Sequence, residues 1–248
     1  MNLGETVLDA LKFPFSNVGR AAGLLLLFLG SILIIPIVLA VGYIFRIIER
    51  TINGFNELPP FDEWGDMFRD GLKYIAVTII YLIVPNILTF VLTNEMFFSI
   101  YSGGFQIGRL LIAVIGMLIA LPFDLVYIMA LGNMAHEDRF GAAFDFSKIF
   151  GLIGKIGWSK YILYVVVFAV IGFLVGIIVQ FGTFLRISFG WEWGAVGIII
   201  SLLVQVYLVM YQGRYIGLIY RKGNLMVKND EEIEGNFEVE ENKDTGSA

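Results

Sequence analysis

The chain alternates long apolar blocks with shorter polar stretches, and the length of the apolar blocks is the first clue to the fold. A helix that crosses a bilayer needs about 20 predominantly apolar residues. The blocks predict membrane spans at about 21–48, 74–93, 107–131, 160–182 and 193–220. We therefore expect an all-α, polytopic integral membrane bundle of about five transmembrane helices, forming a single membrane domain over residues 1–222.

The first block, residues 21–48, allows two interpretations. It contains Gly30, Ser31 and Pro36, which favour a kink or a break. One helix over the whole block would be about 42 Å long and would have to tilt. Each arm of a hairpin would reach about 20 Å and could only re-enter the membrane against other helices. A single kinked span is favoured, and the hairpin, which gives six segments in all, stays open.

Three stretches beside the blocks place apolar and polar residues on opposite faces of a helix. They cover residues 3–18, 60–72 and 140–157. From Phe61 to Ile75, apolar residues recur at helical spacing opposite six charged side chains. Such helices lie in the membrane interface, so we expect three interfacial helices. The second and third each precede a span, a short loop and a span, which suggests an internal repeat. In a full repeat the first block would also be a hairpin.

Composition and charge agree with lipid as the solvent. The chain is 58% hydrophobic and 16% charged, whereas soluble domains are about one quarter charged. The net charge of −5 arises in residues 223–248, which hold 8 acidic and 2 basic residues. This segment has too little apolar content to fold alone and predicts a disordered acidic cytoplasmic tail. The body carries no basic patch of the kind that binds nucleic acid.

Basic residues also predict the orientation. With five crossings, the loops at 49–73 and 132–160 and the C-terminus share one side, which holds 13 of the 17 basic residues. Basic residues favour the cytoplasmic side of a membrane. We expect the C-terminus in the cytoplasm, the N-terminus outside, and the protein in the cell membrane.

Residues 42–74, "GYIFRIIERTINGFNELPPFDEWGDMFRDGLKY", carry a specific pattern. The segment resembles the hallmark stretch of a mainly archaeal family of polytopic membrane proteins, domain of unknown function 4013. "GAAFDFSKI" is similar to a second stretch of that family. The resemblance covers most of residues 10–215, and it implies a multi-pass membrane protein without implying an activity or a cofactor. The motif residues are Gly42, Tyr43, Arg46, Gly54, Leu58, Pro59, Phe61, Asp62, Trp64, Asp70, Gly71 and Lys73.

Asp124 is the foremost candidate for an intramembrane polar site. It lies about nine residues before the cytoplasmic end of its block, roughly 13 Å deep. A carboxylate at that depth is costly, so it should face a partner, water or the bundle interior. It could relay protons or cations or contact a substrate; alternatively it is a structural carboxyl beside a kink at Pro122. The neutral amides inside other blocks more often bond to a neighbouring helix than to a ligand. They are Asn86, Gln180 and Gln205.

Several kinds of chemistry are disfavoured. The chain has no cysteine and one histidine, which leaves neither thiolate chemistry nor a multi-histidine metal site. His136, Glu137 and Asp138 are more typical of a solvated helix end than of a metal site. We therefore predict no catalytic residues, no metal and no cofactor. Four Gly-x-x-x-Gly pairs weakly predict close helix contacts, beginning at Gly104, Gly172, Gly190 and Gly213.

Two functions follow from these patterns. The leading prediction is a non-enzymatic membrane scaffold or interaction protein, with the lipid bilayer and other membrane proteins as partners. The alternative is a small-molecule or ion transporter, or a channel subunit, built around Asp124, because carriers use broken helices around a polar group within the membrane. A transporter requires Asp124 to be reachable by water, whereas a scaffold should bury it.

Overall fold

The computed structural model describes residues 2–30, 33–101, 106–189 and 191–245. Within these residues every regular element is helical, which confirms the all-α prediction. The elements are α1 (Leu3–Lys12), η1 (Phe13–Phe15), α2 (Val18–Leu29), α3 (Ile34–Ile52), α4 (Trp64–Tyr101), α5 (Gln106–Glu137), η3 (Phe140–Phe144), α6 (Phe146–Ile156), α7 (Trp158–Phe189) and α8 (Trp191–Thr245).

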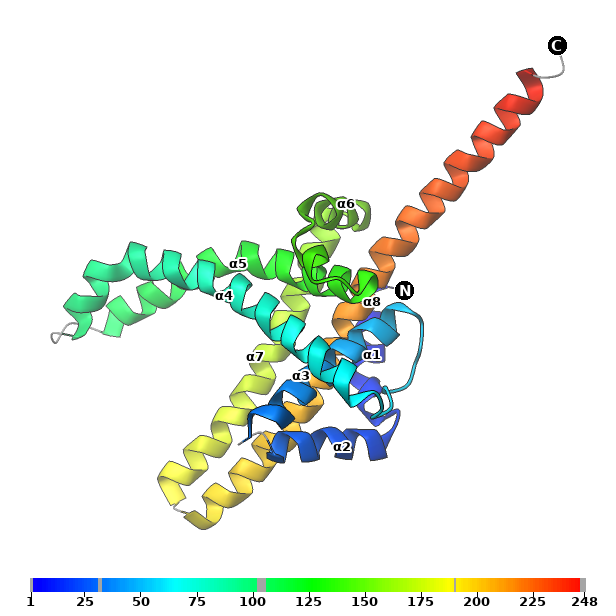
Figure 1. The fold of residues 1–248 in the computed structure, drawn as a ribbon. Coiled ribbons are helices and arrows are strands. Elements are labelled where there is room, and N and C mark those ends of the chain that lie inside the picture. The colour runs from blue at the N-terminus through cyan, green and yellow to red at the C-terminus, as the bar shows by residue number, and fades with distance from the viewer. Residues whose placement is uncertain (1, 31–32, 102–105, 190, 246–248) are drawn as a thin grey trace.

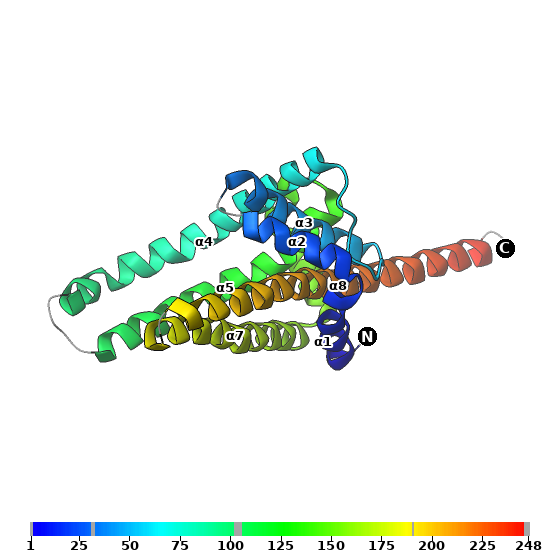
Figure 2. The ribbon, with the colours of Figure 1, turned by 90° about the horizontal axis from the view of Figure 1, so that it is seen from below.

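Four helices are long and apolar enough to cross a membrane. Their spanning parts are Trp64–Thr93, Val114–Glu137, Trp158–Ile178 and Val196–Asn229. They form two antiparallel hairpins, α4–α5 and α7–α8, which diverge from a common base in Figure 1. In Figure 2 both hairpins extend in the same general direction from that base. Most side chains in these windows are uncovered by protein, as expected of helices that lipid surrounds.

The block at residues 21–48 is two helices, and the favoured single kinked span is wrong. Helix α2 is capped at Gly30, and α3 begins at Ile34. The two helices fold back on each other: a Cβ on Gly23 would lie 2.5 Å from the Phe61 ring, which also stacks on Tyr43 of α3. At 12 residues, α2 is about 18 Å long and too short to cross the bilayer core. The block therefore matches the hairpin alternative.

The expected position of the N-terminus also changes. Helix α1 packs against the middle of α8, where Asp9 Oδ1 lies 2.6 Å from Arg214 Nε. Both ends of the membrane domain therefore lie at one end of the bundle. The N-terminus was expected on the opposite side from the C-terminus because five crossings were assumed; the side of the membrane that each end faces stays a prediction.

Of the three expected interfacial helices, one is corrected and two are found. The helix predicted at 60–72 is not a separate interfacial element, because residues 53–63 are non-helical and α4 runs unbroken from Trp64 into the span. The stretch at 140–157 is found as η3 and α6. Gly157 separates α6 from α7 with a φ of 91°, a left-handed conformation that favours glycine. The stretch at 3–18 is found as α1, η1 and the start of α2.

The C-terminal segment is not the expected disordered tail. Helix α8 continues to Thr245 and projects away from the rest of the fold in Figure 1. Residues 228–244 are rich in glutamate and lysine, which are good helix formers. Low apolar content argues against packing into a core, but it does not argue against a helix.

Helix α3 occupies the centre of the fold between α4 and α8. Its contact with α4 depends on two motif glycines at which a side chain has no room. A Cβ on Gly42 of α3 would lie 1.8 Å from the Met67 carbonyl oxygen, and one on Gly71 of α4 would lie 2.1 Å from the Val38 carbonyl oxygen. The two backbones therefore touch directly at this crossing.

The contact of α3 with α8 uses a predicted Gly-x-x-x-Gly pair. A Cβ on Gly213 would lie 3.0 Å from Ile47, and one on Gly217 would lie 2.6 Å from Thr51. The pair at Gly172 and Gly176 differs, since neither position has another heavy atom within 4 Å of a built Cβ. The pairs beginning at Gly104 and Gly190 have their first glycines outside the described residues.

We predict that Gly42→Ala destabilises the protein. Alanine normally favours a helix over glycine by up to about 1 kcal/mol, but here the methyl group would strike the Met67 backbone. Overpacking of this kind costs about 1–3 kcal/mol. The thermal unfolding midpoint of the purified protein in detergent should fall. Gly151→Ala on α6 is the control, because its built Cβ has no neighbour within 4 Å. An unchanged midpoint for Gly42→Ala would contradict the close crossing.

Candidate functional site

The base of the fold is organised by a buried arginine, Arg214 of α8, whose side chain is 2% exposed. Its guanidinium donates to both carboxylate oxygens of Asp9 at 2.6 and 3.2 Å. It also donates to the Phe55 carbonyl oxygen at 2.6 Å and to Asn56 Oδ1 at 2.8 Å. The Phe13 ring covers the group at 4.7 Å. We call this region, where α1, α3, the 53–63 loop and α8 meet, the junction.

The motif residues of α3 fasten the 53–63 loop to the junction. Tyr43 is fully buried, and its hydroxyl donates to the Pro59 carbonyl oxygen at 2.8 Å while its ring stacks on Phe61. Arg46, one turn further along, donates to the carbonyl oxygens of Asp62 at 2.7 Å and Glu63 at 3.0 Å. Glu63 has a φ of 47°, an uncommon conformation for a residue with a side chain. Arg46 therefore stabilises the turn from which α4 begins.

An ion network links α4 to the α5–η3 connection. Lys73 Nζ lies 3.2 Å from Asp70 Oδ1 and 2.6 Å from Asp138 Oδ1. Glu49 of α3 lies close enough to be affected: burial, with the charges of Asp70 and Asp138, raises the pKa of its carboxyl group. The network uses a motif lysine to hold carboxylates together, which is a structural role.

The remaining motif residues also belong to the junction. Leu58 is fully buried, and its carbonyl oxygen accepts a hydrogen bond from Arg20. Gly54 has a φ of 89°, and a Cβ there would lie 3.2 Å from Arg221. Trp64 is half exposed at the start of α4. The motif residues therefore hold the 53–63 loop in place. None of them lines the hollow between the hairpins.

A hollow of about 390 Å³ lies where the two hairpins diverge. All four spanning helices contribute to its lining: Tyr74 of α4; Asp124, Tyr127 and Ile128 of α5; Phe168, Ala169 and Gly172 of α7; and Gln212 and Ile216 of α8. Asp124 is exposed, and it is the only acidic residue in this lining. The Tyr127 hydroxyl is held 2.7 Å from Thr78 Oγ1 of α4, which fixes one aromatic wall.

The other predicted polar residues do not line the hollow. Gln205 lies seven residues before Gln212, so it occupies the same face of α8 about two turns away. Gln180 lies eleven residues after Ala169, about three turns away on the same face of α7. Both are exposed. Asn86 is exposed on α4, and its amide donates to the Leu82 carbonyl oxygen of the same helix at 2.7 Å, whereas a bond to a neighbouring helix was expected.

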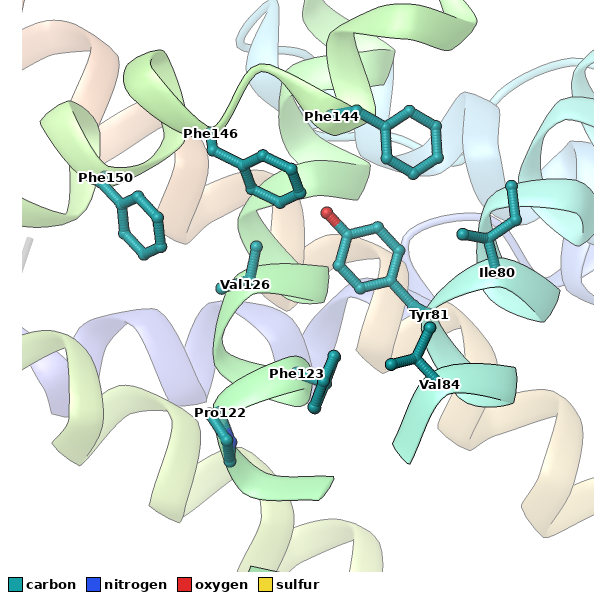
Figure 3. Close-up of a pocket in the computed structure, with 9 residues that line it drawn as sticks. All are labelled: Ile80, Tyr81, Val84, Pro122, Phe123, Val126, Phe144, Phe146 and Phe150. Carbon is teal, nitrogen blue, oxygen red and sulfur yellow. The ribbon is translucent and has the colours of Figure 1, made fainter. Parts of the chain in front are cut away.

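A second cavity, of about 300 Å³, is apolar (Figure 3). Its lining comes from α4, α5, η3 and α6: Ile80, Tyr81, Val84, Pro122, Phe123, Val126, Phe144, Phe146 and Phe150. The Tyr81 hydroxyl donates to the Ala143 carbonyl oxygen at 2.8 Å. Pro122 and Asp124 are two residues apart, so they point to opposite faces of α5, and the carboxylate is absent from this lining.

The cluster at residues 136–138 consists of separately paired side chains. Glu137 contacts Arg139 and Lys148, Asp138 contacts Lys73, and the His136 ring lies against Tyr220. Over the described part of the chain, no three residues of the metal-binding types are grouped as a metal site. These contacts fasten the end of α5 to α6, α4 and α8.

The family assignment follows from a family model described as a protein of unknown function, DUF4013, which matches residues 25–184. The chain belongs to this family. Two similar proteins are the uncharacterized proteins MJ0233 and MJ1189 of Methanocaldococcus jannaschii. The chain is 28% identical to the first over 162 residues, which is 62% of this chain and 56% of that protein. It is 24% identical to the second over 152 residues, 56% of this chain and 48% of that protein. The chain thus spans about half the length of these relatives. No solved structure matches it.

Two site residues of this DUF4013 protein, Arg214 and Gln212, were not predicted from the sequence. Arg214 was included only among the basic residues at the end of a span, although it lies seven residues before the pair Arg221-Lys222 and next to Gly213. Gln212 was not considered, although its spacing from Gln205 places both on one helical face. An arginine well inside an apolar block is the signal that could have identified the junction.

We predict that Arg214→Met destabilises the protein by about 1.5–3 kcal/mol, because it removes the charged donor that Asp9 of α1 shares with Phe55 and Asn56 of the 53–63 loop. The measurement is thermal unfolding in detergent, with limited proteolysis of the 53–63 loop as a local readout. Arg69→Met is the matched control, since Arg69 is 60% exposed and pairs with an exposed Asp66. A surface pair of this kind contributes about 0–1 kcal/mol. Equal effects of the two substitutions would refute the central role of Arg214.

Proposed function

We propose that the protein is a non-enzymatic small-molecule transport protein of the cell membrane, with its solute in contact with Asp124 in the hollow. The observation that carries the proposal is the exposed carboxylate between two diverging hairpins. A polar group within the membrane that all four spanning helices surround is the arrangement from which carriers build their sites. A scaffold would instead be expected to bury this side chain.

The amide side chains support a solute path. Gln212 lines the hollow, and Gln205 follows outward on the same face of α8. Gln180 lies outward from Ala169, another residue of the lining, on α7. The α7–α8 hairpin therefore presents a row of neutral polar groups that leads away from the junction. Neutral amides can hydrogen-bond a passing solute without binding it as tightly as a charge would.

A membrane scaffold is the second candidate, and the uncovered apolar sides of the hairpins favour it. Leu82 and Val91 on α4, and Phe173 and Leu174 on α7, are between 50% and 70% exposed. Other membrane proteins could pack there in place of lipid. The motif residues would then serve to hold the two hairpins at a fixed divergence.

The charge distribution supports a cytoplasmic junction. Because α1 lies at the junction, 15 of the 17 basic residues lie at that end or in the C-terminal extension of α8; the other two are Arg109 and Arg186. Basic residues are retained on the cytoplasmic side. This orientation places both chain ends described here in the cytoplasm.

A single introduced cysteine tests the transport proposal, because the chain has no cysteine of its own. We expect Asp124→Cys to react with a membrane-impermeant thiol reagent, and to react from the side opposite the junction. The reason is that the hairpins diverge away from the junction, whereas the neighbouring α5 residues toward it, such as Met129, are fully buried.

Met129→Cys should stay unreactive from both sides, and Lys228→Cys, which is exposed, should react. If Asp124→Cys remains unlabelled in intact cells and in inverted vesicles while Lys228→Cys reacts, the hollow is dry. The scaffold function would then replace the transport function.

The same reagent tests the orientation. Leu8→Cys on α1 and Lys228→Cys on α8 should both be labelled in inverted vesicles and protected in intact cells, because α1 packs beside α8 at the junction. Opposite labelling of the two positions would show that the N-terminal helix does not lie on the same side as the C-terminal extension. Labelling of both in intact cells would reverse the orientation.

A further inference from the structure

Among the described side chains, the carboxylate of Asp124 has no ion-pair partner. None of the nine residues that line the hollow is basic, and Asp124 forms no ion pair within the described residues. Two basic residues of the junction are already engaged: Lys73 binds two aspartates, and Arg214 binds Asp9. An ionised Asp124 is therefore not balanced by these cations, and its charge is available to a bound cation.

The lining also restricts the chemistry of that cation. A metal ion such as Ca²⁺ takes six to eight oxygen ligands, whereas this hollow offers one carboxylate, one amide and two phenol groups. Three aromatic residues, Tyr74, Tyr127 and Phe168, make up a third of the lining. Aromatic faces attract ammonium groups that carry alkyl substituents, because these shed their water easily. A volume of about 390 Å³ lies within the range of small-molecule sites.

We propose that the hollow is a binding site for a small organic cation, a quaternary or protonated alkylammonium compound. Asp124 supplies the opposing charge, the rings of Tyr74, Tyr127 and Phe168 surround the alkyl groups, and Gln212 accepts or donates one hydrogen bond. The inference rests on the proposed transport function for its biological role, but binding can be measured independently of transport.

The wall formed by α7 provides a way to close the site without changing its charge. Gly172 lines the hollow, and a Cβ there would have no heavy atom within 4 Å. Leucine at this position should therefore fold normally and fill part of the space. Gly176, one turn away on the same helix, is equally open but lies outside the lining, which makes it a matched control.

The experiment is isothermal titration calorimetry of the purified full chain in a neutral detergent. The probe is choline, and the comparison is its uncharged carbon analogue, 3,3-dimethylbutan-1-ol. We expect choline to bind and the analogue not to bind. Asp124→Asn should weaken choline binding about tenfold or more, and Gly172→Leu should abolish it. Gly176→Leu should bind as the unaltered protein does, and size-exclusion profiles should show that every variant is folded.

Four results would overturn the proposal. Equal binding of choline and its neutral analogue would mean that the hollow is only an apolar cavity. Choline binding that survives both Asp124→Asn and Gly172→Leu would place the cation elsewhere, for example at the acidic extension. Absence of choline binding to the unaltered protein, combined with thiol labelling of Asp124→Cys, would leave a water-reachable hollow that serves another solute. Absence of both would reject the transport function together with the site and favour a partner helix.

Discussion

The buried guanidinium of Arg214 is the interaction on which the rest of the fold depends. A charge with 2% exposure is tolerated only when hydrogen bonds and an opposing charge surround it. Here the partners come from α1 and from the 53–63 loop, far from α8 along the chain. Satisfying one side chain therefore fixes the N-terminal helix against the last span. Gly213 and Gly217 on either side let α3 approach closely enough to complete the surroundings with Thr51.

This arrangement concentrates the specific contacts at one end of the molecule. The close glycine crossing of α3 and α4, the fastening of the loop by Tyr43 and Arg46, and the ion network at Lys73 all lie near the junction. Away from it, protein leaves most of the hairpin surface uncovered, and the two hairpins diverge. Without a hydrophobic driving force between helices in a membrane, only such specific contacts hold them together. The hollow around Asp124 arises where those contacts end.

The sequence alone predicts the class of fold because hydrophobic length is a direct signal, and the four longest helices lie where apolar runs predict them. The first block could not be decided this way. Gly30 and Pro36 are compatible with either a kink or a break, and the choice depends on Gly23 packing against Phe61 and Arg20 binding the Leu58 carbonyl, contacts between segments far apart in sequence. The segment at 60–72 has a helical pattern of apolar and polar positions, but it was wrongly expected to be a separate helix. No glycine with a positive φ, such as Gly157 between α6 and α7, separates it from the span, so its helical part belongs to α4.

The family match covers helices α3 to α6 and most of α7, but not helix α8. Residues 25–184 include α3, the loop, α4, α5 and most of α7, so they include both the motif and Asp124. They exclude α8, which supplies Arg214 to the junction and Gln212 and Ile216 to the hollow. The matched region therefore contains the close crossing of α3 and α4 and the loop contacts. It lacks the α8 residues that complete the junction and the hollow. Since the carboxylate comes from the matched part and one wall from outside it, changes in α8 could alter the lining of the hollow while the frame stays the same.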